Sequence, residues 1–181
     1  MTEDIIHKPR SDEEMLHAVP GSRIAMYSDL CRAIKKVGIR RVLRNMVNKS
    51  KKWIILLQDP FDEKSGHWLG LNIFPELHKI YFFSSYGGKP DAEKIEWIPH
   101  LLLVMSEQEI NALNDGLKQL FLEGWDVHYN EYPYQIPGDG TATCGIWTAG
   151  FLNSGMSPTQ FLMYNKQWNI SARQYFNAFF K

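Results

Sequence analysis

The sequence predicts an α+β fold in which a small, mostly antiparallel sheet packs against helices. Two observations lead to this prediction. Three short apolar or alternating segments follow one another between residues 52 and 84, and turn residues separate them. On both sides of this region, apolar residues instead recur at helical spacing, and helix-capping residues precede several of the segments.

The chain has 181 residues, of which 44% are hydrophobic and 13% aromatic, so we expect one compact domain with a sizeable core. No apolar run reaches the roughly 18 residues of a membrane helix. The first residues lack the basic and then apolar pattern of a signal peptide. We therefore expect an intracellular protein without membrane contact, in which Cys31 and Cys144 stay reduced instead of forming a disulfide.

The first 52 residues are predicted to be helical and basic. A capping box at Ser11 and Glu14 begins a short helix, and residues 28–48 are expected to form two helices with a break near Gly38. Nine basic residues and no acidic one lie between positions 32 and 52. Such a block can contact DNA or an acidic partner. Its apolar residues also recur at helical spacing, so we favour the simpler interpretation of a solvated helix face.

The predicted strands are joined mainly by short turns, which indicates antiparallel neighbours. A helix capped by Ser106 and Glu109 and ending at Gly124 is expected before the last strand. The strands are predicted at residues 52–58, 67–74, 79–84 and 125–130.

Near its C-terminal end, the chain is almost wholly apolar over residues 145–152, which predicts a buried helix that ends at Gly155. Helices are also expected after Ser157 and Ser171. Cys144 then lies at the N-terminus of the buried helix, where the helix dipole favours a thiolate. The dipole supplies only about 0.3–1 kcal/mol, less than one pKa unit, so a nucleophilic cysteine also needs a histidine partner.

His67 is the favoured partner among the six histidines. It follows the Ser65-Gly66 turn at the start of a strand, so its ring can lie at a sheet edge and face the end of a helix. His128, in the middle of a predicted strand, is the second choice. Any one histidine, taken alone, is more often structural than catalytic.

Four segments, taken in this order, carry a family resemblance. The chain resembles the adenain-like and Ulp1-like cysteine proteases, and it looks most similar to the maturation proteases of virophages, Polinton-type elements and large DNA viruses. The resemblance covers about residues 53–152, with a weaker match at 19–30. Its segments are Gly66-His67-Trp68, residues 81–91, residues 130–135 and Thr143-Cys144-Gly145.

The resemblance implies a role for each matching residue. Cys144 would be the nucleophile, and His67 the general base and acid. The side-chain amide of Gln135 would stabilise the oxyanion together with the backbone N–H of Cys144. Gln135 precedes Cys144 by nine positions, slightly more than is common in the family, and the glycine-containing loop between them can absorb the difference. Trp68 would line the substrate cleft, although a core position behind the site fits it equally well.

Ser84 stands where the family usually has an acidic or amide residue. A hydroxyl can orient the imidazole, but it cannot stabilise the imidazolium as a carboxylate does. Neutral hydrogen bonds contribute about 0.5–1.5 kcal/mol, against about 1.5–3 kcal/mol for charged ones. We therefore expect a Cys-His-Ser arrangement, with Asp91 or Asn72 as the alternative orienting residue.

By this resemblance, residues 1–181 form a single cysteine-protease domain. It divides into a helical, basic part (1–52), a catalytic core (53–152) and C-terminal helices (153–181). The implied function is an endopeptidase that cleaves viral capsid or core proteins during virion maturation, through a thioester intermediate. We expect a monomer in the host cytoplasm, in the viral factory and in the virion, with a protein substrate and a DNA contact through residues 32–52.

Two other functions stay open at this stage. One is a ubiquitin-like-protein protease of the same family. The other is a non-catalytic nucleic-acid-binding protein, in which Cys144 is an ordinary buried residue. The sequence contains no H-E-x-x-H helix, no cysteine pair for zinc and no phosphate-binding loop, so we expect neither a metal nor another cofactor.

Overall fold

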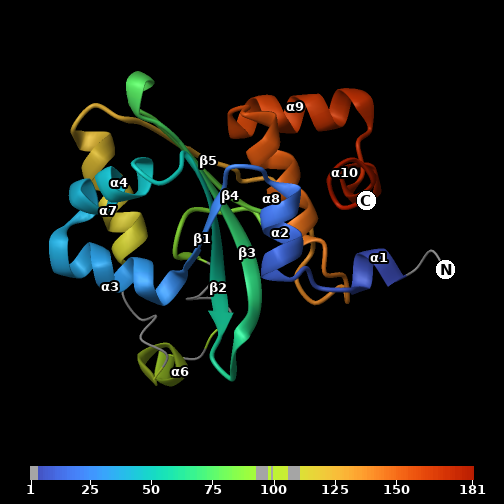
Figure 1. Ribbon diagram of the computed structural model, residues 1–181, viewed down its shortest axis with the longest axis horizontal. Helices are drawn as coiled ribbons and strands as arrows, with labels where there is room; N and C mark the ends of the chain where they lie inside the picture. Colours follow the sequence, from blue (N-terminus) through green and yellow to red (C-terminus); the bar gives the residue numbers. More distant parts are fainter. Residues whose placement is uncertain (1–3, 93–97, 99, 106–110) are drawn as a thin grey trace.

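The computed structural model describes residues 4–92, 98, 100–105 and 111–181. These residues form a five-stranded sheet with helices on both faces (Figure 1). The strands follow their sequence order across the sheet, from β1 to β5. The predicted α+β class, with a small sheet packed against helices, is confirmed.

The strands are β1 (Arg23–Met26), β2 (Lys52–Asp59), β3 (Asp62–Phe74), β4 (Lys79–Ser84) and β5 (Asp126–Tyr129). The helices are α1 (Asp4–His7), α2 (Asp12–Ala18), α3 (Tyr27–Val37), α4 (Ile39–Val47), the short 3-10 helix η1 (Pro75–Leu77), α6 (His100–Met105), α7 (Ala112–Leu122), α8 (Cys144–Ser154), α9 (Pro158–Trp168) and α10 (Ala172–Phe179).

The sheet is mixed, which refines the prediction of a mostly antiparallel sheet. The central strands β2, β3 and β4 pair antiparallel, as predicted. The outer strands β1 and β5 pair parallel to their neighbours. Helices α3 and α4 connect β1 to β2, and α7 leads into β5, so each outer connection is a crossover that returns the chain in the same direction.

Most predicted elements lie close to their predicted bounds. The exception is β3, which begins at Asp62 instead of His67, so the predicted turn at Ser65-Gly66 is wrong and His67 lies inside the middle strand of the sheet. The capping box of α2 is present, and Gly38, with φ of +77°, separates α3 from α4. The strand β1 was not predicted, because it has only four residues and a helix follows it at once. The capping box predicted at Ser106 and Glu109 lies outside the described residues.

Two hydrophobic clusters fill the space on the two faces of the sheet. Helices α3, α4 and α7 cover the face that we call the aliphatic face (Figure 1). Helix α8 covers the opposite face, the aromatic face, and α2, α9 and α10 surround α8. The aliphatic face includes Ile55, Leu57, Leu69, Leu71, Ile73, Leu113 and Leu117. The aromatic face includes Trp68, Tyr81, Phe83, Trp147, Phe151 and Phe161.

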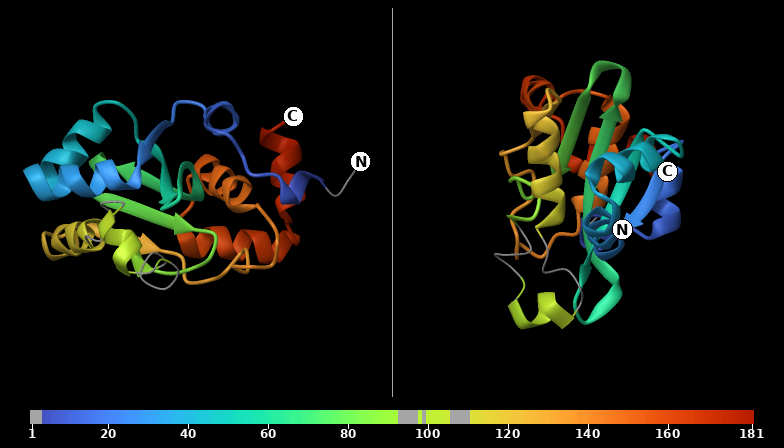
Figure 2. Two further views of the ribbon diagram at one scale, coloured as in Figure 1. Left: turned by 90° about the horizontal axis from the view of Figure 1, so that it is seen from below. Right: turned by 90° about the vertical axis from the view of Figure 1, so that its left-hand side faces the viewer.

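The two ends of the described chain lie on the same side of the molecule. Helix α1 lies beside α10 at one end of the fold (Figure 2). None of the helices in the described part of the chain is long and apolar enough to cross a membrane.

Candidate active site

Cys144 is the first residue of α8. The helix is buried from Cys144 to Leu152, and Cys144 itself is 9% exposed. The local sequence explains this position, since the turn-rich loop that ends at Thr143 cannot continue the helix backwards. The other cysteine, Cys31, is fully buried in the aliphatic face, and no disulfide links it to Cys144.

His67 lies on β3, directly opposite Leu57 of β2. Its Nε2 is 3.2 Å from Oγ of Ser84, the last residue of β4. The ring of Tyr86 stacks on the imidazole, with ring centroids 4.0 Å apart and planes 7° apart. These contacts hold the imidazole in one orientation.

Burial lowers the pKa of His67 to about 3. Removing the imidazole from water disfavours its charged form, and the neighbouring hydroxyl of Ser84 carries no charge to offset this. His67 is therefore neutral at physiological pH. A neutral imidazole has one nitrogen that accepts a proton, as a general base requires.

Asn130 fixes the backbone of Ser84. Its Oδ1 accepts a hydrogen bond from the Ser84 N–H at 2.9 Å, and its Nδ2 donates to the Ser84 carbonyl at 2.7 Å. The side chain thus replaces a missing strand neighbour at the end of β4. The Ser84 hydroxyl also accepts a hydrogen bond from the Tyr86 N–H at 3.2 Å.

Gln135 connects the end of β4 to the loop that leads into Cys144. Its backbone N–H donates to the carbonyl of Ser85 at 3.0 Å, and its Oε1 accepts from the Ser85 hydroxyl at 3.2 Å. Its Nε2 donates to the carbonyl of Thr141 at 2.7 Å. Gln135 is 4% exposed, so this polar side chain is held in place inside the protein.

Cys144 and His67 belong to opposite faces of the sheet. Side chains alternate along a strand, so His67 points to the same face as Leu69, which is the aliphatic face. Helix α8 covers the aromatic face, and the hydroxyl of Thr148 donates to the carbonyl of Trp68 at 3.1 Å. Thr148 lies four residues, about 6 Å of helix rise, beyond Cys144, and Trp68 follows His67. The backbone of Cys144 therefore lies within about one helical turn of the part of β3 that follows His67, on the opposite face of the sheet.

The other predicted residues have different surroundings. Trp68 is 4% exposed, and its indole N–H donates to the carbonyl of Arg10 at 3.0 Å, so it is mainly a core residue. The carboxylate of Asp91 accepts a hydrogen bond from the Asn114 N–H at 2.7 Å in the first turn of α7. Asn72 is five positions from His67 along β3, about 16 Å away. Of the three orienting candidates, Ser84 has its Oγ within hydrogen-bond distance of His67, 3.2 Å from Nε2.

His128, the second choice as base, is exposed on β5 and hydrogen-bonded to Asp126 at 2.5 Å. Sequence reasoning missed Tyr86 and Asn130, although both lie inside the segments that carry the resemblance. A tyrosine two residues after a strand end and an asparagine directly after β5 are the signals that were present.

A metal site is not apparent in the described residues, where no group of three or more His, Cys, Asp or Glu side chains could hold an ion. The predicted site residues are a thiol at the start of α8, a buried imidazole on β3 with a hydroxyl partner on β4, and the buried amide of Gln135, which are groups that nucleophilic chemistry can use.

Comparison with known proteins gives limited but relevant matches. No known protein-family profile matches the chain. An uncharacterized protein, V9 of Sputnik virophage, is 36% identical over 84 residues, which cover 45% of this chain and 44% of V9. The match therefore spans less than half of the relative's length.

The fold is similar to that of two solved structures. The C-terminal Ulp1 protease domain, solved in complex with the yeast SUMO ortholog Smt3, is 17% identical, covering 79% of this chain and 60% of that one with a TM-score of 0.38. The central domain of the uncharacterized Lpg1148 protein of Legionella pneumophila is 16% identical, covering 82% and 76% with a TM-score of 0.39. These values describe a distant likeness of fold, so functional arguments rest on the site itself. The likeness to adenain-like maturation proteases stays a prediction.

Proposed function

We propose that this protein is a cysteine endopeptidase that cleaves viral capsid or core proteins during virion maturation. The observation that carries the proposal is the buried imidazole of His67, hydrogen-bonded to Ser84, on the strand β3 against which α8, the helix that begins with Cys144, packs through Thr148 and Trp68. A neutral imidazole has a ring nitrogen that can accept a proton, which a base that acts on a thiol requires.

The two ring nitrogens of His67 have different roles in the proposed mechanism. In the reactive tautomer the Nε2–H of His67 donates to the Ser84 hydroxyl, which can accept this bond and the one from Tyr86 because oxygen has two lone pairs. The Nδ1 lone pair then accepts the proton of Cys144 as the sulfur attacks the scissile carbonyl. Ser84 orients the ring and does not take up charge.

The cycle has two halves. Collapse of the first tetrahedral intermediate breaks the peptide bond, leaves the acyl group as a thioester on Cys144, and releases an amine that takes the proton from His67. His67 next accepts a proton from water, and the resulting hydroxide attacks the thioester. The second collapse releases the carboxylic acid product and returns the proton to the Cys144 sulfur.

Gln135 has the right chemistry for the oxyanion. One N–H of its amide donates to the carbonyl of Thr141, and the same nitrogen carries a second N–H. That second donor, together with the backbone N–H of Cys144, would bind the oxyanion. Loss of one such donor typically lowers the rate by about 10²–10³-fold.

The viral substrate is supported by the virophage relative, which shares 36% identity over 84 residues. A protein substrate in the viral factory or virion would fit a monomeric enzyme of this size. A ubiquitin-like-protein protease is the alternative within the same chemistry, and a substrate test distinguishes the two.

The first test is co-expression with capsid and core proteins encoded by the same genome. We expect the wild type to cleave at least one of them, and the Cys144→Ala and His67→Gln variants to leave it intact. A ubiquitin-like protein with a C-terminal extension serves as the competing substrate. Cleavage of the ubiquitin-like protein alone would reject the viral substrate and favour a ubiquitin-like-protein protease. Cleavage by the Cys144→Ala variant would show that Cys144 is not the nucleophile.

The second test measures thiol reactivity without any substrate. A dilute alkylating reagent near pH 6 should label Cys144 far faster than Cys31, with peptide mass spectrometry separating the two sites. Burial alone contributes to this difference, since Cys31 is 0% and Cys144 is 9% exposed. The informative comparison is therefore Cys144 in the wild type and in His67→Gln. Equal labelling of Cys144 in both proteins would favour a non-catalytic role.

A DNA contact is a second candidate, supported by the exposure of the basic residues on α3 and α4. Part of this charge is already neutralised, because Arg32, Arg40 and Lys51 form ion pairs with Asp29, Glu123 and Glu76. We therefore expect weak binding that falls steeply as salt is raised. Binding that is unchanged between low and high salt would exclude this electrostatic mode.

A further inference from the structure

We propose that residues 4–10 form a strap that positions both halves of the catalytic pair, and that Arg10 is the positioning residue. The proposal rests on the proposed function, because it concerns the same Cys144 and His67. The strap lies against α10 at the end of the molecule where both chain ends meet (Figure 2).

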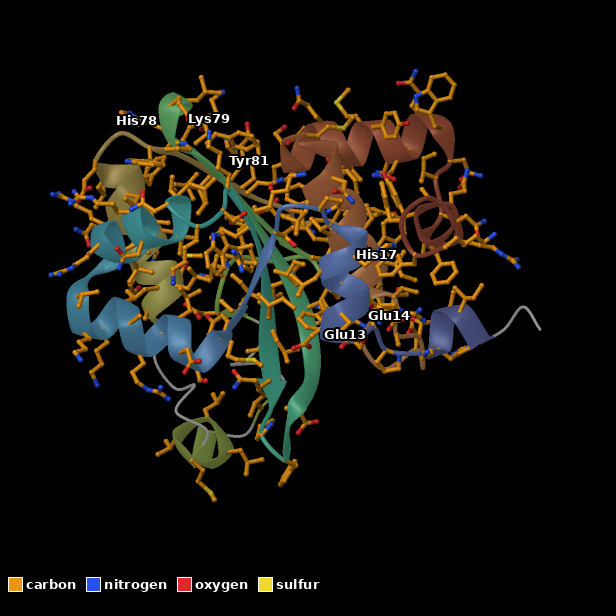
Figure 3. All side chains as sticks on the ribbon, in the orientation of Figure 1. Glu13, Glu14, His17, His78, Lys79 and Tyr81 are labelled. Carbon is orange, nitrogen blue, oxygen red and sulfur yellow. The ribbon has the colours of Figure 1, made fainter. Side chains whose placement is uncertain are left out.

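The guanidinium of Arg10 donates hydrogen bonds to carbonyls within the strap and to a carboxylate on α2. Its Nη2 donates to the carbonyls of Lys8 at 2.6 Å and Ile5 at 2.9 Å, and its Nε donates to Lys8 at 3.1 Å. Its Nη1 donates to the carboxylate of Glu14 at 3.3 Å. Figure 3 shows Glu14 on the side of α2 that faces α1. The Arg10 side chain is 4% exposed, and a buried guanidinium is tolerable only with partners of this kind.

The same guanidinium holds the C-terminal helix. It lies over the ring of Phe176 on α10, 5.2 Å from the centroid, and 5.9 Å from the centroid of Phe180. The planar, delocalised cation of arginine suits an aromatic face better than an ammonium does. Arg10 therefore joins the first residues of the chain to its last helix.

The side-chain stem and the carbonyl of Arg10 contact the residues that follow Cys144 and His67. A Cβ atom on Gly145 would lie 3.0 Å from Cγ and 3.1 Å from Cβ of Arg10, so the arginine stem packs directly against the backbone that follows Cys144. The Arg10 carbonyl accepts the indole N–H of Trp68, the residue after His67, at 3.0 Å. Arg10 thus contacts both Gly145, which follows Cys144, and Trp68, which follows His67.

The strap also holds the loop before the nucleophile. The carbonyl of Ile6 accepts a hydrogen bond from the Ala142 N–H, and Nδ1 of His7 is 2.8 Å from the carbonyl of Gly140. Thr141, between them, provides the carbonyl that holds the Gln135 amide. Displacing the strap would therefore move the oxyanion donor together with the start of α8.

The test compares Arg10→Lys and His7→Ala with the wild type. Lysine keeps the charge of Arg10 but loses the fork of donors and the planar face. His7 is exposed, so His7→Ala removes one loop contact without disturbing the core and stays informative even if the first variant folds poorly. The matched control is Arg173→Lys, an exposed arginine on α10.

Three measurements separate positioning from general destabilisation. Hydrogen exchange by mass spectrometry should be faster over residues 139–146 in both variants and unchanged in the control. The midpoint of the pH profile of Cys144 alkylation should rise by about one unit in Arg10→Lys, equal to a tenfold change in thiolate at a given pH. On a cleaved substrate, kcat should fall about tenfold with KM unchanged, because misalignment affects the reacting groups and not ground-state binding.

The outcomes distinguish the two proposals. Wild-type exchange and a wild-type pH profile in folded Arg10→Lys and His7→Ala would overturn the strap, whatever the activity. Altered exchange in proteins that cleave no substrate, the wild type included, would support positioning by the strap and reject the protease function. A uniform rise in exchange across the whole chain would assign Arg10 a merely structural role.

Discussion

The aliphatic face of the sheet is covered by helices that each expose one side, whereas the aromatic face is covered by α8, which is buried from its first residue through Leu152. Helices α3, α4 and α7 are amphipathic, and each buries one side against the strands. Helix α8 has no polar side, so a second layer formed by α2, α9 and α10 has to enclose it.

This difference shows where each half of the candidate site gets its position. His67 and Ser84 belong to the central antiparallel strands, and their register fixes them. Cys144 belongs to α8, which is enclosed by α2 from the N-terminal part of the chain and by α9 and α10 from the C-terminal part. Strand pairing therefore sets most of the position of the imidazole half, whereas contacts between distant segments set that of the thiol half.

The largest expected effect is the loss of an aromatic side chain from the enclosed side. Phe151 is fully buried, stacks on Phe83 at 4.7 Å and meets Phe161 edge-on at 5.4 Å. Phe151→Ala should lower the free energy of unfolding by about 3–5 kcal/mol in urea denaturation. The matched variant on the aliphatic face, Leu117→Ala, should cost about 2–5 kcal/mol. A loss below 1 kcal/mol for Phe151→Ala would mean that the aromatic layer is not tightly packed.

Alanine substitutions of two helical glycines test how closely the helices approach one another on the two faces of the sheet. A Cβ on Gly116 of α7 would lie 2.9 Å from the Cβ of Ile39, and one on Gly150 of α8 would lie 2.9 Å from the ring of Tyr175. Alanine favours a helix over glycine by about 1 kcal/mol, but overpacking costs about 1–3 kcal/mol. We expect both alanine variants to melt at lower temperature. Gly116→Ala should melt lowest, since a Cβ cannot swing away as the Tyr175 ring can.

The pH dependence of stability tests the burial of His67. Its folded pKa of about 3 lies below its ordinary value, so between pH 6.5 and 3 the unfolded chain binds a proton that the folded chain does not. The stability that comes from keeping His67 neutral is fully present above pH 6.5 and is lost as the pH falls toward 3. Lowering the pH from 7 to 5 should cost the wild type about 2 kcal/mol more than His67→Gln in urea denaturation. Parallel curves for the two proteins would show that the imidazole is not buried in its neutral form.

The smallest expected effect concerns a helix cap on the enclosed side. Ser11 and Glu14 form a complete capping box on α2, whereas α4 has no side-chain hydrogen bond at its N-cap, Gly38. Ser11→Ala should lower the free energy of unfolding by about 1 kcal/mol. Ser157→Ala, which removes the capping box of α9, is the matched control and should behave alike. No change in either variant would indicate that packing alone holds these helices.

Predictions from local patterns were accurate where one segment contains the whole signal. The strand at Lys79–Ser84, the break at Gly38 and the start of α9 at Pro158 follow from apolar runs, a glycine and a capped proline. The parallel pairing of the outer strands did not follow, because strand direction depends on what the connecting segment does in space. Asn130 and Tyr86 were missed for the same reason, since their contacts to Ser84 and His67 exist only after the strands assemble.

By itself, the sequence determined the class of fold, the central strands and the residues from which a thiol site could be built, because hydrophobic periodicity and capping residues act over a few positions. Only the tertiary structure decided that His67 is neutral and bonded to Ser84, and that Arg10 packs against Gly145. Burial and contacts between residues far apart in the chain appear only when the chain is folded, so no short segment encodes them.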